Sequence, residues 1–127
     1  MTRARNLANL TPSTAGLILT DDLDSAAKPL GVSQSWQDVT SSRAVGVTYT
    51  NTTGRSIVVS YFRGGSGADY TYMYLYVNGM EIAENSVYTP GGYSKPLGIS
   101  GVVPAGATYR FEMATNGGSG DSWRELR

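Results

Sequence analysis

Four tyrosines occupy alternate positions within residues 70–77 of the chain. Because every second side chain of a strand lies on the same face, one face of this segment is predicted to carry Tyr70, Tyr72, Tyr74 and Tyr76. The residues between them, among them Met73 and Leu75, suit a face that packs in the core. Tyrosine is enriched in protein interfaces, and its ring also stacks on the apolar face of a sugar. Three interpretations stay open: a subunit interface formed by Tyr72, Tyr74 and Tyr76, a sugar-binding platform, or packing beneath a loop or a second sheet.

A second group of polar and aromatic residues lies in or beside three glycine-rich segments. Binding residues concentrate on loops that a rigid scaffold holds in place. Rings that stack on a sugar, combined with polar groups that bond its hydroxyls, suit a carbohydrate ligand. We therefore predict a ligand-binding set that consists of Arg63, Asp69, Tyr70, Tyr88, Tyr93 and Asn116. The alternative is that these are ordinary solvated loop residues, such as any β-sandwich carries.

The chain contains neither cysteine nor histidine. This composition excludes disulfides, thiol nucleophiles and His-based catalytic triads, and it removes most transition-metal sites. Glycoside hydrolysis would need a pair of carboxylates, but no spacing pairs the candidates Asp69, Glu81, Glu84, Glu112 and Asp121. The cluster of Asp21, Asp22 and Asp24 lacks the glycine and the distal glutamate of a calcium loop. We therefore expect no enzymatic activity, no cofactor and no metal site.

Ten basic residues balance ten acidic residues, so the formal net charge is zero. Proteins that bind duplex nucleic acid usually carry a basic excess, and we therefore expect no nucleic-acid partner. No apolar stretch approaches the ~20 residues of a membrane span. No apolar run of the signal-peptide type follows Arg3 and Arg5. We therefore expect no membrane insertion.

The composition divides the chain into two regions. Residues 1–33 show no strand rhythm, and we expect an extended or short-helical lead-in there. Residues 34–127 hold strand-like runs separated by glycine-rich turns, and Asn78-Gly79 is a strong hairpin signal. The predicted fold is an all-β, antiparallel β-sandwich, jelly-roll-like, in which Trp123 is a buried anchor. Strands are predicted at 44–51, 56–62, 70–77, 80–83, 97–103, 108–114 and 122–126, and loops at 63–69, 84–95 and 116–121.

Segments near both ends of the chain carry a family resemblance. Residues 30–40 and 48–55 resemble the opening of the C-terminal, receptor-binding domains of bacteriophage and prophage tail fibre proteins, and residues 123–126 are similar to their close. Residues 17–27 resemble the segment that precedes such domains, while the likeness is loose between Arg63 and Lys95. The resemblance therefore frames nearly the whole chain.

This resemblance implies a virion protein, made in the cytoplasm of the bacterial host. Distal domains of tail fibres generally form homotrimers and mediate host attachment by binding bacterial surface polysaccharide or lipopolysaccharide. The resemblance also implies that Trp36-Gln37-Asp38 enters the sandwich rather than contacts a ligand. Three alternatives stay open: a structural trimerisation or capping module without a ligand, a capsule-depolymerase fragment, and a free-standing monomeric carbohydrate-binding module.

Overall fold

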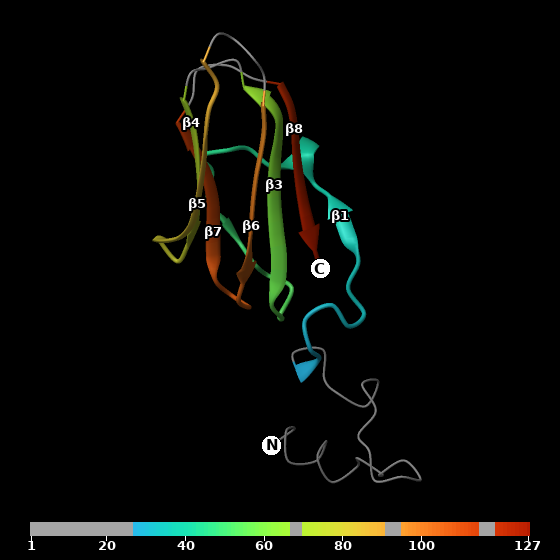
Figure 1. Cartoon of the computed structure of the whole chain (residues 1–127). Coiled ribbons are helices and arrows are strands. Elements are labelled where there is room, and N and C mark those ends of the chain that lie inside the picture. The colour runs from blue at the N-terminus through green and yellow to red at the C-terminus, as the bar shows by residue number, and fades with distance from the viewer. Residues whose placement is uncertain (1–26, 67–69, 91–94, 115–118) are drawn as a thin grey trace, which may run out of the picture.

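Two four-stranded antiparallel sheets pack face to face in the computed structural model, which describes residues 27–66, 70–90, 95–114 and 119–127 (Figure 1). Sheet I has the strand order β1 (Trp36–Asp38), β8 (Ser119–Leu126), β3 (Ile57–Ser66) and β6 (Lys95–Val103). Sheet II has the order β2 (Tyr49–Thr50), β7 (Thr108–Ala114), β4 (Tyr70–Val77) and β5 (Met80–Tyr88). This strand order is that of a jelly roll. The predicted all-β antiparallel sandwich is confirmed.

Strand β4 shows how the sequence pattern becomes the sheet. Met73 and Leu75 have no exposed surface, and the tyrosines between and around them are partly or largely exposed. The strand then turns through Asn78 and Gly79, whose φ angles of 51° and 78° are both positive. Both central positions of the tightest hairpin turn need positive φ, which asparagine and glycine tolerate best. The predicted hairpin between β4 and β5 is therefore confirmed.

The core between the sheets is built around Trp123. Its side chain is 1% exposed, which confirms its prediction as a buried anchor. The ring of Phe111 meets it edge-on at a centroid distance of 4.7 Å, and Tyr61 does so at 5.8 Å. Edge-to-face packing of this kind adds stabilisation beyond the burial of apolar area. Sheets I and II are therefore joined by one aromatic cluster.

Several predicted boundaries are wrong. The segment 44–51 was expected to be one strand, but Gly46 has a φ of 81° and only Tyr49–Thr50 pairs with β7. The predicted loop 84–95 begins with strand, because β5 continues to Tyr88 in register with β4. Similarly, β3 extends to Ser66 and β8 begins at Ser119, both within predicted loops. For β3, β5 and β8, pairing with a neighbouring strand extends the element beyond what local composition favours.

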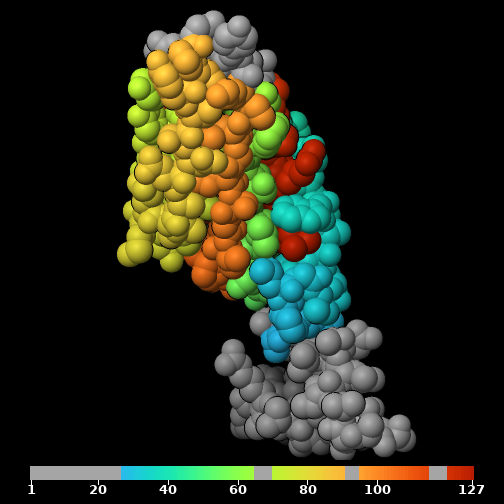
Figure 2. Space-filling view, in the orientation of Figure 1, coloured from blue at the N-terminus to red at the C-terminus, as the bar shows by residue number. Residues whose placement is uncertain are grey.

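The two sheets meet along their free edges on one side of the molecule. Strands β5 and β6 run side by side there, as the yellow and orange atoms of Figure 2 show. The Asn85 side chain of β5 donates a hydrogen bond of 2.7 Å to the backbone carbonyl of Gly98 in β6. An unpaired carbonyl of the edge strand is thereby satisfied by the other sheet.

The short strand β1 pairs with the last strand, β8, and so attaches the N-terminal part of the described chain to the sandwich. All three of its residues pair with β8, and Ser35 and Arg127 exchange backbone hydrogen bonds of 3.1 and 3.2 Å beyond it. The Gln34 side chain adds a hydrogen bond of 2.9 Å to the carbonyl of Ser56, which immediately precedes β3. The chain thus enters the sandwich at one end. The strand ends that flank residues 67–69, 91–94 and 115–118 lie at the opposite end, called the distal end below (Figure 1).

The predictions made for residues 1–26, which include a short helix and the Asp21–Asp24 cluster, lie outside the described residues. Within the described residues, no helix has the length and apolar character needed to cross a membrane.

Candidate functional site

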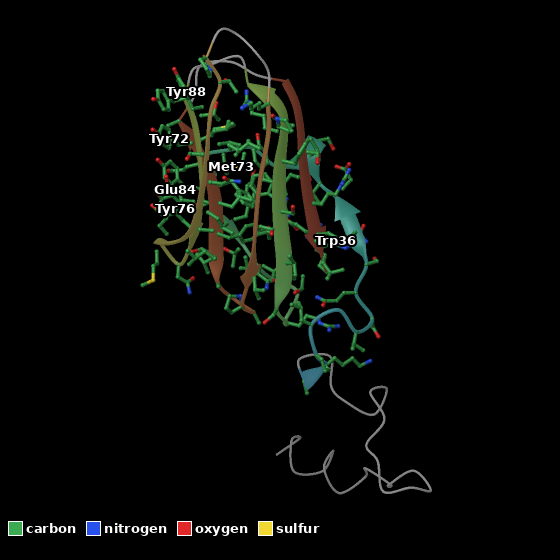
Figure 3. The ribbon with its side chains drawn as sticks, in the orientation of Figure 1. Trp36, Tyr72, Met73, Tyr76, Glu84 and Tyr88 are labelled. Atoms are coloured by element: carbon green, nitrogen blue, oxygen red, sulfur yellow. The ribbon has the colours of Figure 1, made fainter. Side chains whose placement is uncertain are left out.

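The tyrosines of β4 line the outer face of sheet II, which points away from sheet I. Figure 3 shows Tyr72 and Tyr76 on this face, while Met73 points into the core. Centroid distances along the row are 6.2 Å for Tyr70–Tyr72 and 6.4 Å for Tyr72–Tyr74, and both ring pairs are parallel to within 10°. The interpretation that these tyrosines pack beneath a second sheet is therefore wrong. Together with Tyr88 they are called the tyrosine face.

At the distal end of β4 the tyrosine face widens to two strands. Tyr88 of β5 is in register with Tyr70 and their rings stack at a centroid distance of 4.5 Å. Tyr70 is 57% exposed and Tyr88 is 50% exposed. Both belong to the ligand site predicted from the sequence, in which Tyr88 is expected in a loop. The structure brings them together because β5 stays paired with β4 to its last residue.

Charged side chains flank the row on both neighbouring strands. Glu84 of β5 and Glu112 of β7 both stand in register with Tyr74, one on each side. Arg110 forms an ion pair of 2.9 Å with Glu112 and lies 4.9 Å from the centre of the Tyr76 ring. The tyrosine face therefore presents aromatic rings beside carboxylate acceptors.

The hydroxyls of Tyr74 and Tyr76 are held in their neutral form. Desolvation raises the pKa of Tyr74 above its ordinary value, and the nearby Glu84 carboxylate adds to this effect. The pKa of Tyr76 is raised in the same way, with Glu81 as its main charged neighbour. Both hydroxyls are therefore donors as well as acceptors of hydrogen bonds at neutral pH.

A shallow depression adjoins the middle of the tyrosine face. Its volume is about 350 Å³, and Tyr74 and Glu112 form one side of it. Val45 and Gly46 form the other side, from the connection that precedes β2. Sequence reasoning missed these two residues because the segment 44–51 was predicted to be a regular strand. The glycine at position 46 was the available signal, since glycine inside a strand pattern often marks a bend, and its φ of 81° bears this out.

Arg63, also predicted as a ligand residue, lies elsewhere. It is 9% exposed and sits between the two sheets, where its Nε atom is 3.7 Å from a carboxylate oxygen of Asp121. It therefore does not join Tyr70 and Tyr88 on the outer face of sheet II. Three further members of the predicted set, Asp69, Tyr93 and Asn116, lie outside the described residues.

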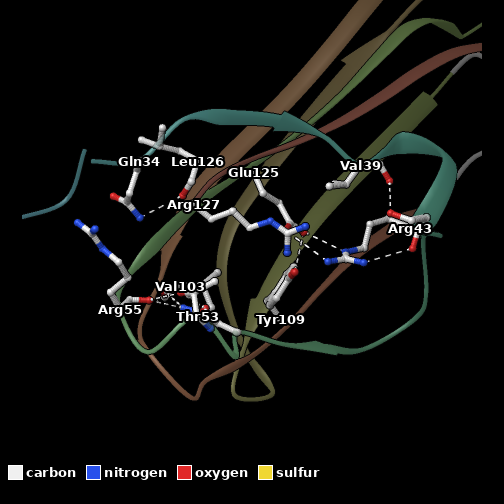
Figure 4. A network of polar contacts seen from close by, with 12 residues as sticks. Gln34, Val39, Arg43, Thr53, Arg55, Val103, Tyr109, Glu125, Leu126 and Arg127 are labelled. Carbon is white, nitrogen blue, oxygen red and sulfur yellow. Dashed lines mark hydrogen bonds and ion pairs between the residues drawn. The ribbon is translucent and has the colours of Figure 1, made fainter. Parts of the chain in front are cut away.

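A buried ion network holds the side of the sandwich where β1 pairs with β8 (Figure 4). Glu125 has no exposed surface and receives hydrogen bonds from Arg43 at 3.0 Å and from the Tyr109 hydroxyl at 2.6 Å. Arg127 forms a second ion pair with it at 3.2 Å. Burial and the hydrogen bond to Glu125 raise the pKa of Tyr109 to about 12. All acceptor sites of this carboxylate face protein donors, so we assign the network a structural role.

The described residues include no group of three or more acidic side chains placed to hold a metal ion. In comparisons with known proteins, the chain matches no protein-family model and no curated protein sequence.

Proposed function

We propose that this chain is the tip domain of a bacteriophage tail fibre and that it attaches the virion to a bacterial surface glycan as a homotrimer. The observation that carries the binding role is the tyrosine face. Five tyrosines form one continuous surface there, and the rings at its distal end are at least half exposed. The resemblance of residues 30–40, 48–55 and 123–126 to tail fibre domains supports the virion assignment.

The chemistry of the tyrosine face suits a neutral or weakly charged sugar chain. Aromatic rings cover the apolar face of a pyranose, and the Glu84 and Glu112 carboxylates on either side of Tyr74 can accept hydrogen bonds from its hydroxyls. A homotrimer would multiply the effect of weak single sites, because linked sites raise avidity by orders of magnitude. Modest affinity at each tyrosine face would then be sufficient for attachment.

A structural role for the same face is the second candidate. Tyrosine rings are frequent at subunit interfaces, and Tyr72, Tyr74 and Tyr76 form an unbroken row. The flanking charges argue against it, because Glu81 and Glu84 on β5 would be desolvated when copies of this face meet. We therefore favour the glycan-binding role for the tyrosine face.

Removing the distal ring pair tests the proposal. We expect the double substitution Tyr70→Ser plus Tyr88→Ser to weaken retention on purified bacterial surface polysaccharides and lipopolysaccharides by about tenfold or more. The substitution Phe62→Ser is the matched control, because Phe62 is 42% exposed on the outer face of sheet I. Unchanged retention of the double variant on every polysaccharide that the unmodified protein binds would overturn the glycan-binding role of this face.

A further inference from the structure

A cleft opens between the two sheets, and it shares Val45 and Met113 with the depression beside the tyrosine face. Its volume is about 310 Å³, at the lower end of the range for small-molecule sites. It draws on η3 (Thr40–Ser42), β3, β7 and β8, and its main lining side chains are Thr40, Tyr61, Arg63, Met113, Asp121 and Trp123. Asp121 is 41% exposed and therefore marks the side at which the cleft meets solvent.

Three polar atoms of this lining are buried without hydrogen-bond partners in the described structure. They are the indole nitrogen of Trp123, the Nε atom of Arg63, and the hydroxyl of Tyr61, which has the Asp121 carboxylate beside it as an electrostatic neighbour. Trp123 is 1% exposed and Tyr61 is 3% exposed, so bulk water does not satisfy them. A buried polar group left unsatisfied loses its hydrogen bonds to water without compensation, and such groups are rare in folded proteins. Their gathering in one cleft indicates that an acceptor-bearing molecule belongs there.

The guanidinium of Arg63 is the strongest of these donors, and its contacts in the described structure are weak ones. Its Nη1 atom contacts the thioether sulfur of Met113 at 3.1 Å, which is a weak acceptor. Its approach to Asp121, at 3.7 Å, is an ion pair longer than a hydrogen bond. A planar guanidinium matches the two oxygens of a carboxylate, and such paired bonds are among the strongest that a protein makes.

The lining offers one cation to an anionic ligand, in competition with Asp121. It contains two guanidinium groups, Arg43 and Arg63, and one carboxylate, Asp121. Arg43 is already engaged by the buried Glu125, so Arg63 is the cation available to a ligand. Ala44, Val45 and Met113 supply apolar walls for the rest of a compact molecule.

We infer that this cleft binds the carboxylate of an acidic sugar unit through Arg63. The carboxylate part of the inference rests on the cleft alone, and the sugar part rests on the proposed function. The cleft would then select glycans that carry an acidic sugar. The tyrosine face, on the outer side of sheet II, contacts the glycan independently.

The two tryptophans of the chain give a direct readout of this site. Trp123 lines the cleft, whereas Trp36 is 55% exposed in β1 (Figure 3). In nitrogen–proton correlation spectra of the full chain, D-glucuronate should shift the Trp123 indole resonance in a saturable way and leave that of Trp36 in place. D-glucose, which has the same ring without the carboxylate, should not shift it. Propionate, a carboxylate without the ring, should shift it more weakly.

Two variants with opposite expected effects sharpen the test. Arg63→Gln should weaken D-glucuronate binding by about tenfold or more, because the charged partner is lost. Asp121→Asn should tighten it several-fold, because a carboxylate that competes for Arg63 is neutralised. Asp121 is partly exposed, so this variant remains informative if Arg63→Gln does not fold. Arg124→Gln is the control, because Arg124 is the exposed neighbour of Trp123 on the same strand.

Specific outcomes would overturn the inference. One is that the Trp123 indole resonance shifts with neither D-glucuronate nor propionate. The other is that D-glucose shifts it as much as D-glucuronate does. A response to propionate alone would overturn the sugar assignment. None of these outcomes bears on the tyrosine face, whose Tyr70 and Tyr88 resonances report glycan contact separately. If the Tyr70 and Tyr88 resonances do not shift when a glycan is added, while the Trp123 resonance does, the proposed role of the tyrosine face would be overturned instead.

Discussion

Tyr109 and Glu125 show how a single buried contact ties stability to pH. The Tyr109 hydroxyl donates to the carboxylate at 2.6 Å, and both side chains are almost fully buried. Ionising the hydroxyl would place two negative charges side by side in the core. The neutral phenol is therefore favoured in the folded state, where its pKa is raised from 10 to about 12. Because the folded pKa is the higher one, this contribution to stability is complete below pH 10 and is lost as pH rises toward 12.

We expect the free energy of unfolding, measured in urea across an alkaline pH series, to fall steadily between pH 10 and about 12. The substitution Tyr109→Phe should lower stability at neutral pH by about 1–2 kcal/mol and should make the alkaline decline shallower. Some decline should remain, since burial also raises the pKa of Tyr61. An identical pH profile for the variant and the unmodified protein would show that the hydrogen bond does not have this role.

At the scale of the element, strand β6 depends on one glycine to keep the sheets at packing distance. A Cβ atom at Gly101 would lie 2.6 Å from Leu75 and 3.1 Å from Ile82, which belong to the opposite sheet. Leu75 has no exposed surface and hence little room to move. A side chain at this position would therefore push β6 away from β4 and β5.

We expect Gly101→Ala to lower the free energy of unfolding by about 1–3 kcal/mol, as overpacking of a core typically does. Gly98→Ala in the same strand is the matched control. Its Cβ would lie 3.3 Å from the ring of Phe62, which is half-exposed and free to adjust. In denaturant unfolding experiments, Gly101→Ala should therefore lose clearly more free energy of unfolding than Gly98→Ala. Equal stability of the two variants would contradict the close approach at Gly101.

The elements also show where sequence reasoning succeeds and where it stops. Strand β4 and its hairpin could be predicted, because period-2 alternation and an Asn-Gly turn are local signals. The full length of β5 could not, because its second half is held by pairing with β4 rather than by its own composition. The cleft around Arg63 was invisible for a related reason. It joins side chains from β3, β7 and β8, and only the register between those strands brings them together.

For the whole molecule, the proposed homotrimer predicts a solution mass. Light scattering on a sizing column should give three times the chain mass of 13.5 kDa. The substitutions Tyr72→Ser plus Tyr74→Ser should leave that mass unchanged, because the flanking carboxylates make this face a poor subunit contact. A monomeric double variant would make the tyrosine face the subunit interface. A monomeric unmodified chain would instead favour a free-standing binding module.

Under the proposed function, the pairing of β1 with β8 has a mechanical consequence for a fibre tip attached to its receptor. The chain enters at one end of the sandwich, and the exposed ring pair Tyr70–Tyr88 lies at the other. Tension between shaft and receptor would therefore pull β1 along its own length. The hydrogen bonds to β8, together with those that link Ser35 and Arg127, run across that direction and share the load in shear. A strand loaded in shear must break these bonds together rather than one after another, so even this three-residue strand resists extraction while the tip stays bound.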